Sequence, residues 1–284
     1  MKNVAGSVRT VGTRTKVLAA GVAAAVAVGL AIPATTADAH GTRHPSGPKP
    51  TIVLVHGAFA DSSGWSKVIK RLQRDDYTVY AVSNPLRGLT TDAPYVRAFL
   101  ETIPGPIVLV GHSYGGAVIT NAATGNENVK ALVYINAFAL DEGENVLTAI
   151  GLGGGSSDLS NHIVPRPFPG AAEGDADAYI DPAFFRELFC ADLSAKTSAV
   201  LAASQRPAAA SSLAIPSGEP AWKTIPSWYL ASTQDNTIPV EAERYMAERA
   251  GSHTVEIDSS HVAMMSHPSV VTKLILSAVR GTSK

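Results

Sequence analysis

The chain has 284 residues, of which 45% are hydrophobic and 17% are charged, and 23 basic side chains nearly balance 24 acidic ones, giving a formal net charge of -1. This composition excludes a disordered or fibrous protein, because it is too apolar for the first and lacks the compositional bias of the second. The balanced charge also argues against a basic surface for nucleic acid, so we expect no nucleic-acid partner.

The first 39 residues have the pattern of a secretory signal peptide. Their basic residues are Lys2, Arg9, Arg14 and Lys16. An unbroken apolar run follows at 17–32, and Ala37-Asp38-Ala39 forms a small-x-small cleavage site. The apolar run is shorter than the roughly 20 residues that a membrane-spanning helix needs, so we expect cleavage after Ala39 and no stable membrane anchor. The sequence therefore predicts a secreted, extracellular protein.

Cleavage would remove four basic residues and one acidic residue. The remaining chain has 19 basic and 23 acidic residues and a net charge of -4. Its length of about 245 residues is compatible with a single α/β domain. Cys190 is the only cysteine, which excludes an internal disulfide and a cysteine-based metal site. It lies in the apolar run FFRELFCADL, where we expect it to be buried. We expect no metal and no cofactor.

After a proline-rich leader at 40–50, short apolar runs alternate with helical patterns from residue 51 onward. The predicted strands are TIVLVHG, TVYAVS, PIVLVGHS, VKALVYINAF, SWYLAS and HTVEID, which are rich in β-branched residues and apolar on both faces. Helices are predicted at 64–75, 91–103, 114–124, 240–250 and 268–279. This alternation predicts the α/β class, with a parallel sheet covered by helices on both sides.

The segment at about 138–225 interrupts this alternation, because it is too long for an ordinary connection. It begins with the glycine-rich stretch 151–157 and continues with helical patterns at 182–193 and 195–213. We interpret it as an inserted helical cap over one end of the sheet. Its aromatic residues Phe184, Phe185 and Phe189 would either line a substrate pocket or pack the cap onto the core.

The most informative motif is Gly111-His112-Ser113-Tyr114-Gly115, a G-x-S-x-G sequence between a predicted strand and a predicted helix. A nucleophilic serine on a sharp strand-to-helix turn requires this arrangement, since small neighbours let the turn close. The helix that follows favours developing negative charge at its N-terminus. We therefore expect Ser113 to be a nucleophile.

A serine hydroxyl needs a base, and the histidine pKa suits neutral pH. The motif resembles that of the α/β-hydrolases, and this resemblance implies that the acid and then the histidine follow the serine, each after a late strand. Four histidines follow Ser113 in the chain: His162, His253, His261 and His267. His162 falls in the cap and His253 begins a strand, whereas His261 follows the strand HTVEID and precedes the last helix. We predict His261 as the base, with His267 as the alternative.

The acid that orients the histidine is expected in the loop after the preceding strand. Asp235 lies just past SWYLAS, although an aspartate beside an asparagine is also common in turns. Asp141, past the strand VYINAF, is the rival position, and Glu142 and Glu144 are weaker versions of it. Chain order favours Asp235.

Hydrolysis also needs N–H donors for the oxyanion. The backbone N–H of Tyr114, next to the nucleophile, is one, and the loop after the first strand should supply the second. We assign it to Ala58, with Phe59 as the second choice. His56 in the same loop is expected to have a structural role. We expect Phe59 and His112 to contact substrate, in a pocket to which Trp222, Met264 and Met265 could add apolar surface.

These residues resemble the α/β-hydrolase superfamily over about residues 51–279. The segments HGAFADSSGW, GHSYGG and SHVAMMSHP are similar to those of small bacterial carboxylesterases, pyrethroid-hydrolase-like esterases, plant methyl esterases and hydroxynitrile lyases. The resemblance implies a Ser113–His261–Asp235 triad and an oxyanion hole from Ala58 and Tyr114. Only residues 40–50 remain for strands before the first predicted one, which implies a reduced sheet of about six strands.

We therefore expect a serine carboxylesterase that cleaves small to medium carboxylic esters through an acyl-enzyme, with a small-molecule ester as its partner. The alternatives are a hydroxynitrile lyase-like or perhydrolase activity on the same triad, and a ligand-binding protein without turnover. The plant lyases have lysine directly after the histidine, where this chain has Val262, which weakens the lyase alternative. The sequence does not identify the substrate or the oligomeric state.

Overall fold

The structure, a computed structural model, describes residues 48–282. The predicted signal peptide and most of the predicted leader lie outside the described residues. Among residues 48–282, no helix has both the length and the hydropathy that a membrane span requires.

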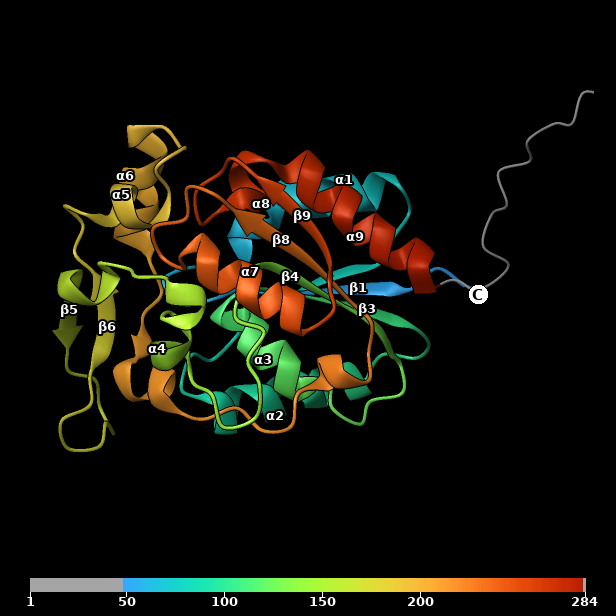
Figure 1. The fold of residues 1–284 in the computed structure, drawn as a ribbon, viewed down its shortest axis with the longest axis horizontal. Coiled ribbons are helices and arrows are strands. Elements are labelled where there is room, and N and C mark those ends of the chain that lie inside the picture. Colours follow the sequence, from blue (N-terminus) through green and yellow to red (C-terminus); the bar gives the residue numbers. More distant parts are fainter. Residues whose placement is uncertain (1–47, 283–284) are drawn as a thin grey trace, which may run out of the picture. The chain divides into compact units, whose positions relative to one another are not determined.

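The core of the described chain is a six-stranded sheet with the strand order β2-β1-β3-β4-β8-β9 (Figure 1). Its strands are β1 (Thr51–Val55), β2 (Val79–Val82), β3 (Ile107–Ser113), β4 (Val129–Ala137), β8 (Ser227–Ser232) and β9 (His253–Ile257). All neighbouring pairs are parallel. Because parallel strands end at the same edge of a sheet, the loops that follow them meet there. The predicted α/β class and the six-stranded sheet are confirmed.

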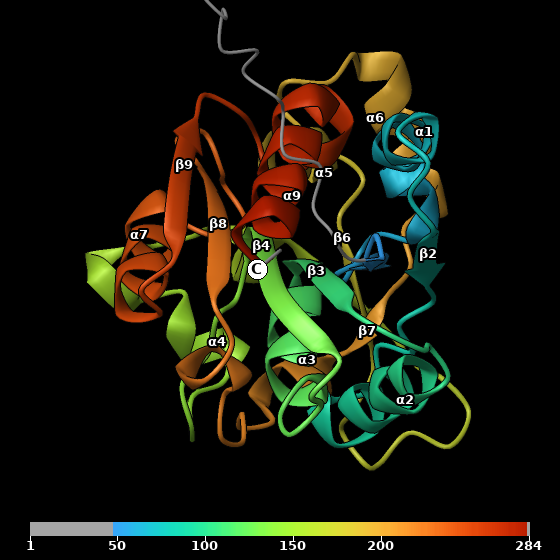
Figure 2. The ribbon, with the colours of Figure 1, turned by 90° about the vertical axis from the view of Figure 1, so that its right-hand side faces the viewer.

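Helices cover both faces of this sheet. They are α1 (Ser66–Arg74), α2 (Leu89–Glu101), α3 (Tyr114–Ala122), α7 (Val240–Arg249), α8 (Ala263–Ser266) and α9 (Pro268–Thr282), and a 3-10 helix, η1 (Ser62–Trp65), precedes α1. Figures 1 and 2 show α1 and α9 on one face and α2 and α3 on the other. The central strands β3 and β8 are buried along their whole length, as expected for parallel strands with helices on both sides, whereas the edge strand β9 is largely exposed.

Most of the segment between β4 and β8 forms a cap at the left of Figure 1. Its helices are α4 (Val146–Ala149), α5 (Phe185–Phe189) and α6 (Ala195–Ser204), with short 3-10 helices η2 (Leu152–Gly154), η3 (Leu159–His162), η4 (Ala210–Ala214) and η5 (Ala221–Lys223). The cap also contains an antiparallel sheet that the sequence did not indicate, with β5 (Ile163–Arg166), β6 (Asp177–Ile180) and β7 (Ala208–Ala209). Its strands have two to four residues, too few for an alternation to stand out.

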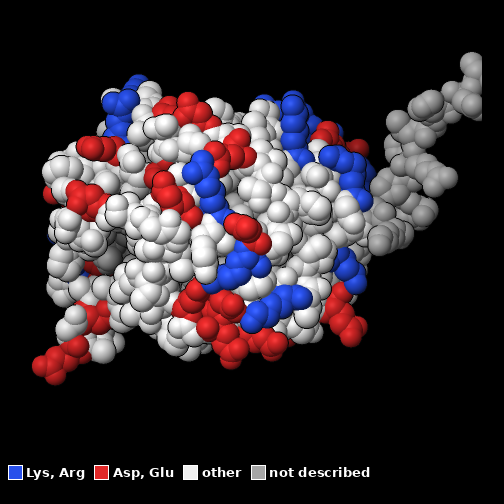
Figure 3. Space-filling view, in the orientation of Figure 1, with Lys and Arg blue, Asp and Glu red and all other residues white. Residues whose placement is uncertain are grey.

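Charged side chains are mixed on the face drawn in Figure 3. Lys and Arg are interspersed with Asp and Glu there and do not form a continuous basic surface. Several charged residues of the described chain form ion pairs, such as Arg244 with Glu256 at 2.7 Å. Exposed pairs of this kind contribute at most about 1 kcal/mol each, so the buried sheet dominates stability.

Candidate active site

Ser113 occupies a strained turn between β3 and α3. Its backbone has φ 54° and ψ -128°, a conformation that side-chain-bearing residues rarely adopt and that persists only where the surroundings enforce it. A Cβ on Gly111 would lie 2.6 Å from the carbonyl oxygen of Gly115, and a Cβ on Gly115 would lie 2.6 Å from that of Val55. Glycine is therefore required at position 111 by the turn itself and at position 115 by the approach of β1.

The loop after β1 lies directly against Ser113. A Cβ on Gly57 would be 2.5 Å from the Ser113 Cβ, so only glycine allows this approach. The N–H of Phe59 donates to the carbonyl of Arg206 at 2.9 Å, which removes Phe59 as an oxyanion donor. Within residues 48–282, the N–H of Ala58 has no acceptor. The N–H of Tyr114 begins α3 and so lacks an acceptor within that helix. These are the two donors predicted from the sequence.

Asp235 and His261 meet at the same end of the sheet. His261 Nδ1 lies 2.6 Å from Asp235 Oδ2, and both side chains are fully buried. The other carboxylate oxygen, Oδ1, accepts the N–H groups of Thr237 at 2.7 Å and Ile238 at 2.9 Å. Because an ionised carboxylate only accepts, it requires the proton of neutral His261 on Nδ1. The Nε2 atom, which has no hydrogen-bond partner among the described residues, then carries a lone pair that can take a proton.

The rival residues lie elsewhere. Asp141 binds Lys223 at 2.8 Å, and that hydrogen bond lowers the pKa of the Asp141 carboxyl. The remaining candidates are also engaged or exposed: Glu144 pairs with Arg249, Glu142 is exposed, His162 pairs with Asp158, His253 begins β9, and His267 lies 3.9 Å from Asp192. The structure therefore brings together Asp235 and His261, as chain order predicts.

The expectation that His112 contacts substrate needs correction. Its side chain is fully buried, and its Nε2 lies 2.9 Å from the carbonyl oxygen of His261. The residue before the nucleophile points into the fold, where its ring lies 4.7 Å from that of His261. Burial, together with the neighbouring His261, lowers the pKa of His112, so its neutral ring donates to the His261 carbonyl. His112 thus holds the backbone of the candidate base through this hydrogen bond. His56 is structural, as expected: its Nδ1 contacts the Gly57 carbonyl.

The cap packs against the candidate base. Phe189 of α5 lies edge-on to the His261 ring, with the ring centroids 5.1 Å apart, and also contacts Phe59 at 6.3 Å. Ser113 is 5% exposed and His261 is completely buried. Of the three cap aromatics, Phe189 is thus the one that reaches the site.

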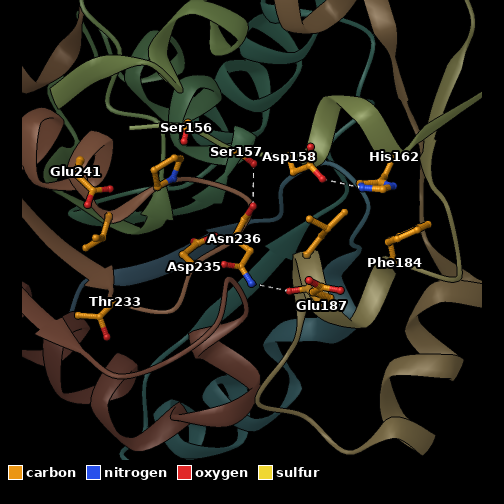
Figure 4. A pocket seen from close by; sticks show the side chains of 13 residues that line it. Ser156, Ser157, Asp158, His162, Phe184, Glu187, Thr233, Asp235, Asn236 and Glu241 are labelled. Atoms are coloured by element: carbon orange, nitrogen blue, oxygen red, sulfur yellow. Dashed lines mark hydrogen bonds and ion pairs between the residues drawn. The ribbon is translucent and has the colours of Figure 1, made fainter. Parts of the chain in front are cut away.

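Two cavities lie near these residues. A narrow cavity of about 20 Å³ has a mainly apolar lining, with Phe59, Phe189, Leu201, Val262, Met264 and Met265. Trp222 does not line this cavity. Its indole N–H donates to the Leu140 carbonyl at 2.9 Å. A larger cavity of about 420 Å³ is polar, and of the three residues of the predicted triad only Asp235 lines it (Figure 4). The apolar cavity adjoins the loop after β1 and Val262, but it is only large enough for a water molecule, and neither Ser113 nor His261 lines either cavity.

Sequence reasoning missed two carboxyl groups near the candidate base and acid, of which Glu243 is buried and Asp192 is not. Glu243 of α7 is fully buried and accepts the N–H of Ser232 at 2.8 Å and the amide of Asn136 at 3.2 Å. Burial, and then the nearby Asp235, raise the pKa of Glu243 well above its usual value. Asp192 of the cap binds the loop before His261. Neither contact leaves a local signal in the sequence, because each joins distant segments. In residues 48–282, no cluster of three or more His, Cys, Asp or Glu could hold a metal ion.

Comparisons with known proteins agree with this geometry. Putative methylesterase 11, chloroplastic, of Arabidopsis thaliana is 25% identical over 247 residues, which is 80% of this chain and 63% of that protein's length. Polyneuridine aldehyde esterase has a similar fold, with a TM-score of 0.69, 21% identity and coverage of 81% of this chain and 99% of that one. A pyrethroid hydrolase from Sphingobium faniae JZ-2 gives a TM-score of 0.68 at 21% identity, covering 81% and 97%.

These similarities confirm the resemblance inferred from the sequence, including the methylesterase-like group. The description of the matching family is "Alpha/beta hydrolase family", and the match extends over residues 52–274, from β1 into α9. That range includes the strained serine, the oxyanion loop and the buried Asp–His pair. The chain belongs to the alpha/beta hydrolase family.

Proposed function

We propose that this protein is a serine esterase that hydrolyses small to medium carboxylic esters. The observation that carries the proposal is the buried 2.6 Å contact between Asp235 and His261, with Nε2 of His261 left without a partner among the described residues. The relatives named as a methylesterase, an aldehyde esterase and a pyrethroid hydrolase support ester hydrolysis.

In the proposed reaction, the Ser113 hydroxyl oxygen attacks the ester carbonyl while His261 Nε2 takes the hydroxyl proton. The N–H groups of Ala58 and Tyr114 stabilise the negative oxygen, each by roughly 3 to 4 kcal/mol. His261 then gives its proton to the departing alcohol, which leaves an acyl group on Ser113. A water molecule, deprotonated by His261, releases the acid and restores the serine. Asp235 holds the ring and stabilises its charged form throughout.

The narrow cavity supports an apolar substrate group by its lining alone, because at about 20 Å³ it holds no more than a water molecule. Its apolar lining by Phe59, Met264 and Met265 favours an apolar acyl or alcohol group, and the cover provided by Phe189 favours a small one.

The test is a series of p-nitrophenyl esters of increasing acyl length, assayed with the full-length protein and with Ser113→Ala. We expect turnover that is highest for short acyl chains and is abolished by the substitution. Tight binding of esters without turnover would instead indicate a binding protein on this fold and would overturn the proposal.

We also propose that the protein is exported with removal of residues 1–39. The support is the sequence alone, namely the basic start, the apolar run at 17–32 and the cleavage site at Ala39. Extracellular action on small esters is compatible with the proposed mechanism, which uses no cofactor and no metal ion.

A further inference from the structure

The turn between α5 and α6 carries a carboxylate that binds the loop of the candidate base. Asp192 Oδ2 accepts the hydroxyl of Ser259 at 2.9 Å and the backbone N–H of Ser260 at 3.1 Å. Its Oδ1 accepts the hydroxyl of Ser260 at 2.5 Å. A single cap side chain thus makes three hydrogen bonds to the two residues that immediately precede His261.

The two serines that bind Asp192 are buried. Ser259 and Ser260 are 1% and 2% exposed, whereas the side chain of Asp192 is 27% exposed. Although burial favours the neutral form, the hydrogen bonds from Ser260 lower the pKa of Asp192 below its usual value. The ionised carboxylate therefore remains an acceptor, and hydrogen bonds to a charged group are stronger than neutral ones. The imidazole of His267, 3.9 Å away, also faces Asp192.

The same cap segment also reaches the loop of the candidate acid. The carbonyl of Leu188 accepts the hydroxyl of Thr237 at 2.7 Å. The carbonyl of Glu187 accepts the amide of Asn236 at 2.9 Å, a contact drawn in Figure 4. Residues 187–192 therefore bridge the two loops that carry Asp235 and His261.

We propose that Asp192 is a positioning residue for His261, so that the seating of the cap controls the geometry of the base. Asp192 does not touch the reacting atoms. It fixes the backbone at residues 259–260, which keeps His261 Nδ1 on Asp235 and directs Nε2 toward the serine. The proposal rests on the esterase function proposed above.

If Asp192 only tethered the cap and had no effect on His261, its loss would have different consequences. Loss of a tether would lower stability and alter substrate binding, and so would change KM and the melting temperature. Loss of positioning lowers kcat for each competent active site, because a displacement of about 1 Å can cost roughly 100-fold in rate. The two roles therefore separate in the division between kcat and KM.

The experiment compares Asp192→Ala and Asp192→Asn with a matched cap variant, Asp175→Ala. Asp175 also accepts a serine N–H at 3.0 Å and a serine hydroxyl at 2.7 Å, both from Ser211, but it binds no catalytic loop. Asparagine at 192 keeps one oxygen for the Ser260 N–H, and its amide can donate to the Ser260 hydroxyl oxygen. Active sites are counted by fluorophosphonate titration, and kcat and KM are measured with p-nitrophenyl acetate.

We expect Asp192→Ala to lower kcat by about 10- to 100-fold with KM changed by less than about threefold, whereas Asp192→Asn and Asp175→Ala stay within about threefold of wild type. An unchanged kcat in Asp192→Ala, or an equal loss in Asp175→Ala, overturns the proposal. Where Asp192→Ala does not fold, Ser260→Ala removes one of the three bonds, and an unchanged kcat in that variant has the same meaning. An inactive wild-type protein would instead overturn the esterase function itself.

Discussion

Replacement of Asp235 by asparagine tests the Asp–His geometry. In the structure, Oδ1 of Asp235 accepts two backbone N–H groups, from Thr237 and Ile238, and Oδ2 accepts His261 Nδ1. The oxygen of asparagine should stay on the two N–H groups, because the flipped amide would leave two buried donors unpaired, at about 1 to 3 kcal/mol each. The amide NH₂ then faces His261 Nδ1 and can only donate to it.

This arrangement places the single proton of neutral His261 on Nε2, where it cannot accept the proton of Ser113. A wrong tautomer of this kind lowers kcat by about 10⁴-fold, which corresponds to roughly 5 kcal/mol of transition-state stabilisation. The assay is kcat with p-nitrophenyl acetate at neutral pH, with thermal unfolding to verify that the variant folds. Because the substitution keeps the shape of the side chain, we expect a melting temperature close to that of the wild type.

The matched control is Asp141→Asn, which removes the rival carboxylate that pairs with Lys223. We expect this variant to keep kcat within about twofold, since exposed ion pairs contribute little. The reasoning would be refuted if Asp235→Asn kept more than about one-tenth of the wild-type kcat, or if Asp141→Asn lost as much activity.

Three further predictions concern stability, access and export. Because the pKa of Glu243 is raised, its contribution to stability is complete below its ordinary pKa of 4.5 and is lost as pH rises through the folded-state pKa. In urea unfolding, Glu243→Gln should therefore lose less stability between pH 5 and 8 than the wild type does. An identical pH dependence of the two proteins would contradict this. Phe189→Ala should raise the ratio of kcat/KM for octanoyl over acetyl esters while lowering stability by about 3 to 5 kcal/mol, and an unchanged ratio would argue against Phe189 as the cover of the site. N-terminal sequencing of protein recovered from the culture medium should begin at His40, and an intact N-terminus would argue against cleavage.

The parts of the fold that repeat locally could be predicted from the sequence. Parallel strands such as PIVLV, buried on both faces, are continuous apolar runs, and Gly111 is required by a close backbone approach within the turn itself. Chain order then identified Asp235 and His261, because loops after parallel strands meet at one edge of the sheet.

The parts that depend on distant contacts could not be predicted. Asp192 and Ser260 are 68 positions apart, and only the folded cap shows that they bind. The burial of His112 depends on the side of the turn to which its side chain points. The cap sheet β5-β6-β7 pairs strands of two to four residues, which leave no periodic pattern.

The central claim is that Ser113 is a nucleophile activated by His261. The most direct measurement is to incubate the protein with a fluorophosphonate probe, digest it and locate the adduct by mass spectrometry. The account predicts a single adduct on Ser113, absent from Ser113→Ala and formed far more slowly in His261→Ala. An unlabelled wild-type protein, or label that persists in Ser113→Ala, would contradict it.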